Sequence, residues 1–221
     1  MERTRFRDRA EAGRLLAEQL RDYAGRDDVV VLALPRGGVP VGYEVAKALR
    51  APLDAFVVRK LGVPGYEELA MGAIASGGVV VLNPEPIRAL GISDEEIRRA
   101  AAKEEVELRR REEVYRGGHD PPEVEGKTVI IVDDGLATGS TMRAAALAVR
   151  QLNPARVVVA VPVAAAETCD AFRDVVDDIV CHVTPRPFRA VGLWYDDFSQ
   201  TSDEEVRELL ERANDYTAAR E

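Results

Sequence analysis

Two adjacent carboxylates stand at the end of an apolar run in the middle of the chain. Asp133 and Asp134 follow residues 129–132, VIIV, and precede the segment 135–141, GLATGST. A buried strand that ends in two carboxylates brings them to the edge of a sheet where ligands bind. There each carboxylate can accept a hydrogen bond from a neighbouring hydroxyl, so the pair suits the 2,3-diol of a ribose.

The segment after this pair has the composition of an anion site. Gly135 and Gly139 permit backbone conformations in which successive amide groups point inward. Thr138, Ser140 and Thr141 add hydroxyl donors, and a helix expected to start near Thr141 contributes the positive end of its dipole. Diol acceptors beside a phosphate cradle predict a ribose 5-phosphate site.

Two other classes of protein place acidic residues after a strand, and neither fits. A receiver domain has its acidic pair after the first strand, whereas Asp133 lies in mid-chain. A P-loop protein has Gly-Lys-Thr after a strand, but residues 126–128 precede one, and Pro121 stands at the position of the first glycine of that motif.

Residues 129–141 resemble the motif with which type I phosphoribosyltransferases bind 5-phosphoribosyl 1-diphosphate (PRPP), an acidic pair followed by a T-G-[small]-T loop. The resemblance implies parallel strands with flanking helices, a variable hood over the acceptor, and transfer of ribose 5-phosphate with loss of pyrophosphate. It gives Asp133 and Asp134 a catalytic role. It assigns the 5-phosphate to Gly135, Leu136, Ala137, Thr138, Gly139, Ser140 and Thr141.

Residues 34–38, LPRGG, resemble the pyrophosphate loop of the same family, in which a non-proline cis peptide commonly turns amides toward the diphosphate. Carried over, the cis bond joins Pro35 to Arg36, and the loop residues that bind pyrophosphate are Pro35, Arg36, Gly37 and Gly38. An ordinary strand-to-helix turn with glycines is the alternative.

Residues 59–78 occupy the position of the family's catalytic lid, a long loop or hairpin. Breaking the C1–O bond leaves an oxocarbenium-like ribose that water would trap, so a lid that excludes water is needed. The diphosphate leaves with several negative charges, which cations stabilise. We expect Arg36, Arg59 and Lys60 to supply them, although Arg59 and Lys60 could instead simply end a strand in solvent.

Residues 188–198 look like the hood of the hypoxanthine-guanine enzymes. On that pattern Phe188 stacks on a base, Trp194 helps to bind the acceptor, and Asp196 lies near the base or Mg²⁺; the alternative is that these aromatics only pack. Mg²⁺ is expected as the Mg–PRPP complex, held by substrate oxygens and waters. Candidate protein ligands to it are Asp133, Asp134 and Asp196.

Two departures leave the acceptor unnamed. The hypoxanthine-guanine enzymes have an Asp where this chain has Ala137, and a Lys on the strand that matches residues 156–163, where only Arg156 is basic. The adenine enzymes share the Ala-Thr-Gly run but have a different hood.

Alternating strands and helices predict an α/β fold with a doubly wound, mostly parallel sheet. Asp8 is expected to cap a helix over residues 9–23. The continuous apolar runs expected as strands are 29–34, 53–58, 79–82, 129–132, 157–163 and 179–183, and the other core helices are expected at 39–49, 141–152 and 167–175.

The chain is long enough for one domain, residues 1–221. We expect a core over about 27–82 and 126–184, a charged helical insertion over about 83–125, and a small hood with the C-terminal segment over about 185–221. Ser93 and Glu96 form a capping box that opens a helix through about Tyr115.

Composition excludes several classes of protein. With 30 Lys and Arg against 39 Asp and Glu, the net charge is −9, the wrong sign for holding nucleic acid by broad phosphate neutralisation. We expect no membrane span, no secretory signal and a cytoplasmic location. Cys169 and Cys181 are expected to be buried free thiols, and His182 a core histidine.

The resemblance therefore implies a Mg²⁺-dependent glycosyltransferase that moves ribose 5-phosphate from PRPP to a nucleobase-like acceptor. We expect a homodimer acting in nucleotide salvage and nucleoside metabolism. A non-catalytic PRPP- or nucleotide-sensing regulator of the same fold is the alternative.

Overall fold

The computed structural model describes residues 5–218, with side chains described to residue 215. Five parallel strands form its central sheet, in the order β2-β1-β6-β7-β8. Their bounds are β1 Val29–Ala33, β2 Leu53–Ala55, β6 Thr128–Val132, β7 Arg156–Val163 and β8 Asp178–Val183. Every residue of β1 and β6 is buried, as continuous apolar runs predict for a sheet that is covered on both faces.

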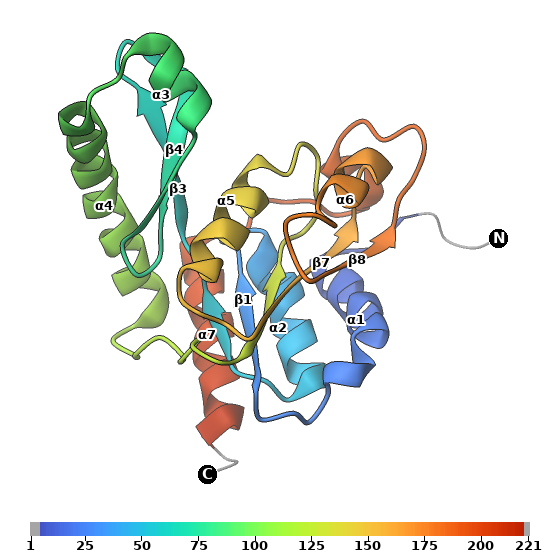
Figure 1. The fold of residues 1–221 in the computed structure, drawn as a ribbon. Helices are drawn as coiled ribbons and strands as arrows, with labels where there is room; N and C mark the ends of the chain where they lie inside the picture. The colour runs from blue at the N-terminus through green and yellow to red at the C-terminus, as the bar shows by residue number, and fades with distance from the viewer. Residues whose placement is uncertain (1–4, 219–221) are drawn as a thin grey trace.

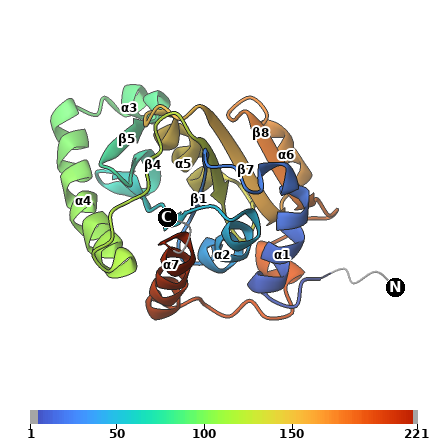
Figure 2. The ribbon, with the colours of Figure 1, turned by 90° about the horizontal axis from the view of Figure 1, so that it is seen from below.

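Helices cover both faces of this sheet, which confirms the doubly wound fold (Figures 1 and 2). One face carries α1 Arg9–Gln19, α2 Gly38–Leu49 and α7 Asp203–Ala218, and the other carries α5 Ser140–Arg150 and α6 Ala166–Ala171. Successive residues of β1 point to opposite faces, so Val31 lies in the core under α2 while Leu32 lies in the core under α5.

The order of the strands places a topological switch point between β1 and β6. From β1 the chain crosses through α2 to β2 at one edge of the sheet, while β6 lies on the other side of β1. The loops that follow β1 and β6 therefore diverge, and ligands bind doubly wound sheets at such a switch point.

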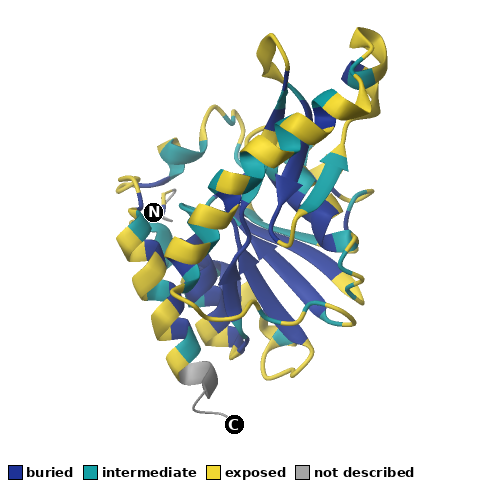
Figure 3. Ribbon diagram, turned by 90° about the vertical axis from the view of Figure 1, so that its left-hand side faces the viewer, coloured by how far each residue is buried: buried dark blue, intermediate teal, exposed yellow. Residues whose placement is uncertain are grey.

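A smaller antiparallel sheet projects from the core beside two helices (Figure 1). It contains β3 Val58–Val63, β4 Tyr66–Ala75 and β5 Val79–Leu82, followed by α3 Pro84–Leu90 and α4 Asp94–Arg116. The strand expected at 79–82 forms, but it pairs with β4 and not with the core sheet. Figure 3 shows that the outer side of α4 is exposed, whereas the core strands are buried.

The capping box of α4 is confirmed, whereas the helices α3 and α7 were not anticipated. The Ser93 side chain and the Glu96 side chain cap each other's backbone, and α4 ends at Arg116. In the C-terminal segment, α7 packs against α2 and α4, and its buried residues are Val206, Leu210 and Ala213.

The expectation of free thiols is wrong. Cys169 on α6 and Cys181 on β8 form a disulfide, with their Cα atoms 6.7 Å apart. Cys169 is buried in the core on the α5 side of the sheet, and Cys181 is partly buried against the same core. His182 is partly buried beside the Phe6 ring, with 6.0 Å between ring centroids.

None of the helices described between residues 5 and 218 combines the length and apolar character needed to cross a membrane.

Candidate functional site

The loops after β1 and β6 lie in direct contact. Leu34 N–H donates to the Val132 carbonyl at 2.9 Å. A Cβ atom on Gly38 would lie 2.8 Å from that same carbonyl oxygen, and one on Gly37 would lie 2.2 Å from Asp134 Oδ2. Glycines at both positions let the loops approach this closely. The predicted cis peptide between Pro35 and Arg36 is present.

The acidic pair lies at this contact and is largely withdrawn from water. The Asp134 N–H donates to Asp133 Oδ1 at 2.8 Å, and 15% of the Asp134 side chain is exposed. Burial raises the pKa of Asp133, and the neighbouring charge of Asp134 raises it further. Burial also raises the pKa of Asp134, against the opposing charge of Arg9. Two carboxylates held this close are well placed to accept hydrogen bonds from a diol.

Arg9, at the start of α1, is a site residue that the sequence did not indicate. Its Nε donates to Asp134 Oδ2 at 2.9 Å and its Nη1 donates to the Ser199 carbonyl at 2.7 Å. Its Cζ lies 4.1 Å from the centroid of the Phe198 ring. The guanidinium therefore joins the acidic pair to the segment after residue 197.

The predicted phosphate loop connects Asp134 to α5. Gly139 is the N-cap of α5 and has a left-handed backbone with φ of 73°, where a Cβ would lie 2.7 Å from the Phe172 ring. Thr138 and Ser140 are exposed on either side of it. Exposed hydroxyls at the N-terminus of a helix of 11 residues fit an anion.

The hood lies against the acidic pair through its backbone and one tyrosine. The Tyr195 hydroxyl donates to the Asp134 carbonyl at 2.6 Å, and burial raises the pKa of this phenol. The N-terminal segment pairs with the hood, because Phe6 N–H donates to the Trp194 carbonyl at 2.8 Å. Phe188 and Trp194 are partly buried in the small apolar cluster that surrounds Phe6 and Tyr195.

Comparison with known proteins shows the family to which the chain belongs. Residues 5–185 match the family described as the phosphoribosyl transferase domain. The chain belongs to the phosphoribosyltransferase family. Two Mycobacterium tuberculosis proteins, from strains CDC 1551 and H37Rv, are named provisionally as phosphoribosyl transferases and are 47% identical to it over 209 residues, or 95% of this chain. The chain spans about half the length of these curated relatives, 47%.

A solved structure is similar over almost the whole chain. The crystal structure of TT1426 from Thermus thermophilus has 44% identity and a TM-score of 0.83, and the match covers 94% of this chain and 98% of that one. The purine phosphoribosyltransferase of Pyrococcus horikoshii is more distant, at 19% identity and a TM-score of 0.45, over 82% of this chain and 90% of that one.

The three cations predicted from the sequence lie in two places. Arg36 is on the loop predicted to bind pyrophosphate, and its Nη1 is 3.7 Å from Oδ1 of Asp203 at the start of α7. Arg59 and Lys60 lie on β3 of the small sheet. The Arg59 guanidinium donates to Glu104 of α4 at 2.9 and 2.6 Å. Its hydrogen bonds therefore point to α4 and not to the acidic pair.

The oxygens at the site fit Mg²⁺ bound together with a substrate. Within residues 5–218 no group of three or more His, Cys, Asp or Glu could hold a metal by itself. Asp133 and Asp134 offer carboxylate oxygens where the loops after β1 and β6 meet, and Mg²⁺ characteristically combines one or two carboxylates with phosphate oxygens and waters. Asp196 lies on the exposed side of the hood.

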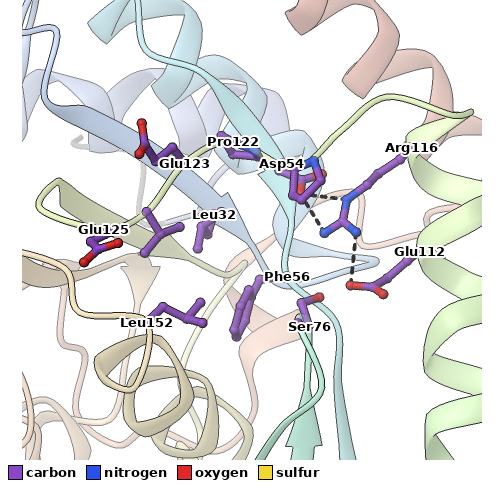
Figure 4. Close-up of a pocket in the computed structure, with 13 residues that line it drawn as sticks. Leu32, Asp54, Phe56, Ser76, Glu112, Arg116, Pro122, Glu123, Glu125 and Leu152 are labelled. Atoms are coloured by element: carbon purple, nitrogen blue, oxygen red, sulfur yellow. Dashed lines mark hydrogen bonds and ion pairs between the residues drawn. The ribbon is translucent and has the colours of Figure 1, made fainter.

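A separate hollow of about 370 Å³ lies at the base of the small sheet (Figure 4). One wall is an ion triad in which Arg116 of α4 donates to Asp54 of β2 at 2.9 Å and lies 3.2 Å from Glu112. Apolar side chains face it from Leu32, Phe56 and Leu152. The hollow shares no lining residue with the loops that carry the acidic pair, so it is distinct from the candidate site.

The structure thus brings together the acidic pair, the two loops predicted to bind pyrophosphate and the 5-phosphate, and the hood. Sequence reasoning missed Arg9 and Tyr195, which contact Asp134 from segments 125 and 61 residues away in the chain. Tyr195 stands inside the aromatic hood motif, so its position was a usable signal. Arg9 is one of many charged residues near the N-terminus, and nothing local distinguishes it.

Proposed function

We propose that this chain transfers ribose 5-phosphate from PRPP, as its Mg²⁺ complex, to a nitrogenous, nucleobase-like acceptor and releases pyrophosphate. The observation that carries the proposal is the contact between the end of β6, at Asp133 and Asp134, and the Gly37–Gly38 turn after β1. A carboxylate pair for a diol lies beside a turn suited to a diphosphate, and a ribose 1-diphosphate carries both groups on adjacent carbons.

Each loop then has one task. The diphosphate lies along residues 35–38 near Arg36, the ribose hydroxyls lie on Asp133 and Asp134, and the 5-phosphate lies at the start of α5 over residues 135–141. The bond from C1 to the diphosphate oxygen breaks, and the acceptor nitrogen forms the new bond to C1. Pyrophosphate leaves with the bonding electrons, and the proton on the acceptor nitrogen passes to solvent.

Bound Mg²⁺ would neutralise charge on the leaving diphosphate. Lid closure by the β3–β4 hairpin would exclude water from the oxocarbenium-like ribose. Arg59 and Lys60 are on this hairpin, so in our proposal they approach the diphosphate when it closes. In the present arrangement Arg59 must first leave Glu104.

For the acceptor we propose the face of the hood, with Phe188, Trp194 and Asp196. Ala137 cannot exchange a proton with a base nitrogen, and β7 carries no lysine. Both features favour an acceptor other than a 6-oxopurine. A cytoplasmic homodimer acting in nucleotide salvage is part of the same proposal.

The test is a screen for pyrophosphate release. The full chain is mixed with Mg²⁺, PRPP and, in turn, adenine, guanine, hypoxanthine, xanthine, uracil and orotate. With one of these acceptors the reaction should release pyrophosphate from PRPP. Asp133→Asn or Asp134→Asn should weaken PRPP binding or turnover. Binding of PRPP by calorimetry, with no release from any acceptor, would refute the transferase.

That result would support the second candidate, a PRPP- or nucleotide-sensing regulator of the same fold. The packing of Phe188 and Trp194 into the cluster around Phe6 favours this candidate, because buried rings offer less surface for stacking on a base.

A further inference from the structure

The Arg9 guanidinium lies where the two ligand loops meet. Its Nε is 2.9 Å from Asp134 Oδ2 and would be 3.3 Å from a Cβ atom on Gly37. The pair is mostly withdrawn from water, since 12% of the Arg9 side chain and 15% of the Asp134 side chain are exposed. Ion pairs in such surroundings are screened much less than surface pairs.

The guanidinium is also fixed from the opposite side. Nη1 donates to the Ser199 carbonyl at 2.7 Å, and the Phe198 ring lies under Cζ at 4.1 Å. Asp8 caps the helix at this point, because its Oδ1 accepts from Glu11 N–H at 2.7 Å. The backbone of Arg9, its charge and its plane are therefore all held.

The guanidinium holds one of the two carboxylate oxygens of Asp134. Oδ2 accepts from Arg9, and Asp133 Oδ1 accepts from the backbone N–H of Asp134, which sets the two carboxylates side by side. Two adjacent carboxylates repel each other when both are ionised. The guanidinium opposes this repulsion.

We infer that Arg9 is a positioning residue for the ribose site: it holds Asp134 in the orientation that accepts a hydroxyl and couples this carboxylate to the hood at residues 198 and 199. The inference rests on the proposed function. A lysine at this position would carry the charge but could not present two donors in a fixed plane to Asp134 and Ser199.

The test is a double-mutant cycle on PRPP binding. Calorimetry with PRPP and Mg²⁺ is run on the wild type, Arg9→Gln, Asp134→Asn and the double variant. Arg9→Gln should weaken binding about tenfold, within the range of coupling between contacting residues. In the Asp134→Asn background the same change should have no further effect, because Arg9 acts through Asp134.

Two further variants complete the design. Arg9→Lys should restore part of the affinity that Arg9→Gln loses, and it carries the test if Arg9→Gln does not fold. Arg14→Gln is the matched control on the same helix, because Arg14 forms a surface pair with Glu44 at 3.3 Å and its side chain is 50% exposed. This control should bind PRPP as the wild type does.

Each outcome is decisive. Equal affinity of Arg9→Gln and Arg14→Gln would overturn the inference and leave the proposed function standing. A full effect of Arg9→Gln in the Asp134→Asn background would also overturn it, since Arg9 would then contact the ligand directly. Absence of PRPP binding by the wild type would refute the proposed function itself.

Discussion

Replacing Arg116 by methionine should destabilise the protein strongly. Arg116 ends α4 and binds Asp54 of β2 through Nε at 2.9 Å and Nη2 at 2.8 Å, with Glu112 at 3.2 Å on its other side. The Asp54 side chain is 8% exposed and that of Arg116 is 16% exposed. The substitution keeps much of the side-chain volume and leaves two buried carboxylates without a cation.

The magnitude follows from that burial. Breaking a buried ion pair by removing one partner costs about 3 to 5 kcal/mol. In a chain of this size each kcal/mol lowers Tm by about 2 to 4 °C, so the expected fall in Tm is about 6 to 20 °C. Arg99→Met is the matched control on the same helix, because Arg99 and its partner Glu95 are both 74% exposed. Surface pairs of this kind contribute about 0 to 1 kcal/mol.

The same variant should have a characteristic pH dependence. Burial raises the pKa of Asp54 while Arg116 lowers it, so in Arg116→Met this pKa should rise further. A carboxyl with a higher pKa in the folded state gains its proton there first, and the folded state is then favoured as the pH falls. The difference in Tm between wild type and Arg116→Met should therefore be largest at about pH 8 and should shrink toward about pH 5.

Calorimetric unfolding of the two variants between these pH values is the assay. Equal Tm values for Arg116→Met and Arg99→Met would refute the reasoning. A Tm difference between wild type and Arg116→Met that grows as the pH falls would also refute it.

Three further outcomes are expected. Gly37→Ala places a Cβ 2.2 Å from Asp134 Oδ2 and should weaken PRPP binding by about 100-fold, as a misplacement of about 1 Å can do, measured by calorimetry with circular dichroism to confirm folding. Tyr195→Phe leaves the Asp134 carbonyl without its donor and should lower the free energy of unfolding by about 1 to 3 kcal/mol in denaturant titrations. Burial lowers the pKa of His182, so the unfolded state binds its proton first and stability falls as the pH drops through about 6.5; a Tm series from pH 5 to 8 should show a smaller fall in His182→Gln.

Elements with a local cause could be predicted from the sequence. The apolar runs at β1 and β6 indicated strands buried on both faces, and Ser93 with Glu96 indicated the start of α4. The acidic pair and the glycine loops stand at strand ends, where parallel strands must present them. The same capping logic was available at Ser202, whose hydroxyl accepts from Glu205 N–H at 3.1 Å, and it would have revealed α7.

Features that depend on tertiary contact could not be predicted. An apolar run does not say which sheet it joins, so β5 was expected in the core although it pairs with β4. Cys169 and Cys181 lie 12 residues apart, and only the packing of α6 on β8 brings their sulfur atoms together. Arg9 reaches Asp134 across 125 residues, and periodicity along α1 gives no sign of that contact.

The contacts that Arg9 and residues 195–199 make around Asp134 have a consequence for biosynthesis. Both ligand loops have been synthesised by residue 141, but Tyr195, Phe198 and the Ser199 carbonyl follow more than fifty residues later and complete the contacts around Asp134 and Arg9. A nascent chain that stalls between these points carries the full loop motifs without the groups that hold them. Truncated products should therefore be retained on an immobilised PRPP analogue only if they extend beyond Ser199.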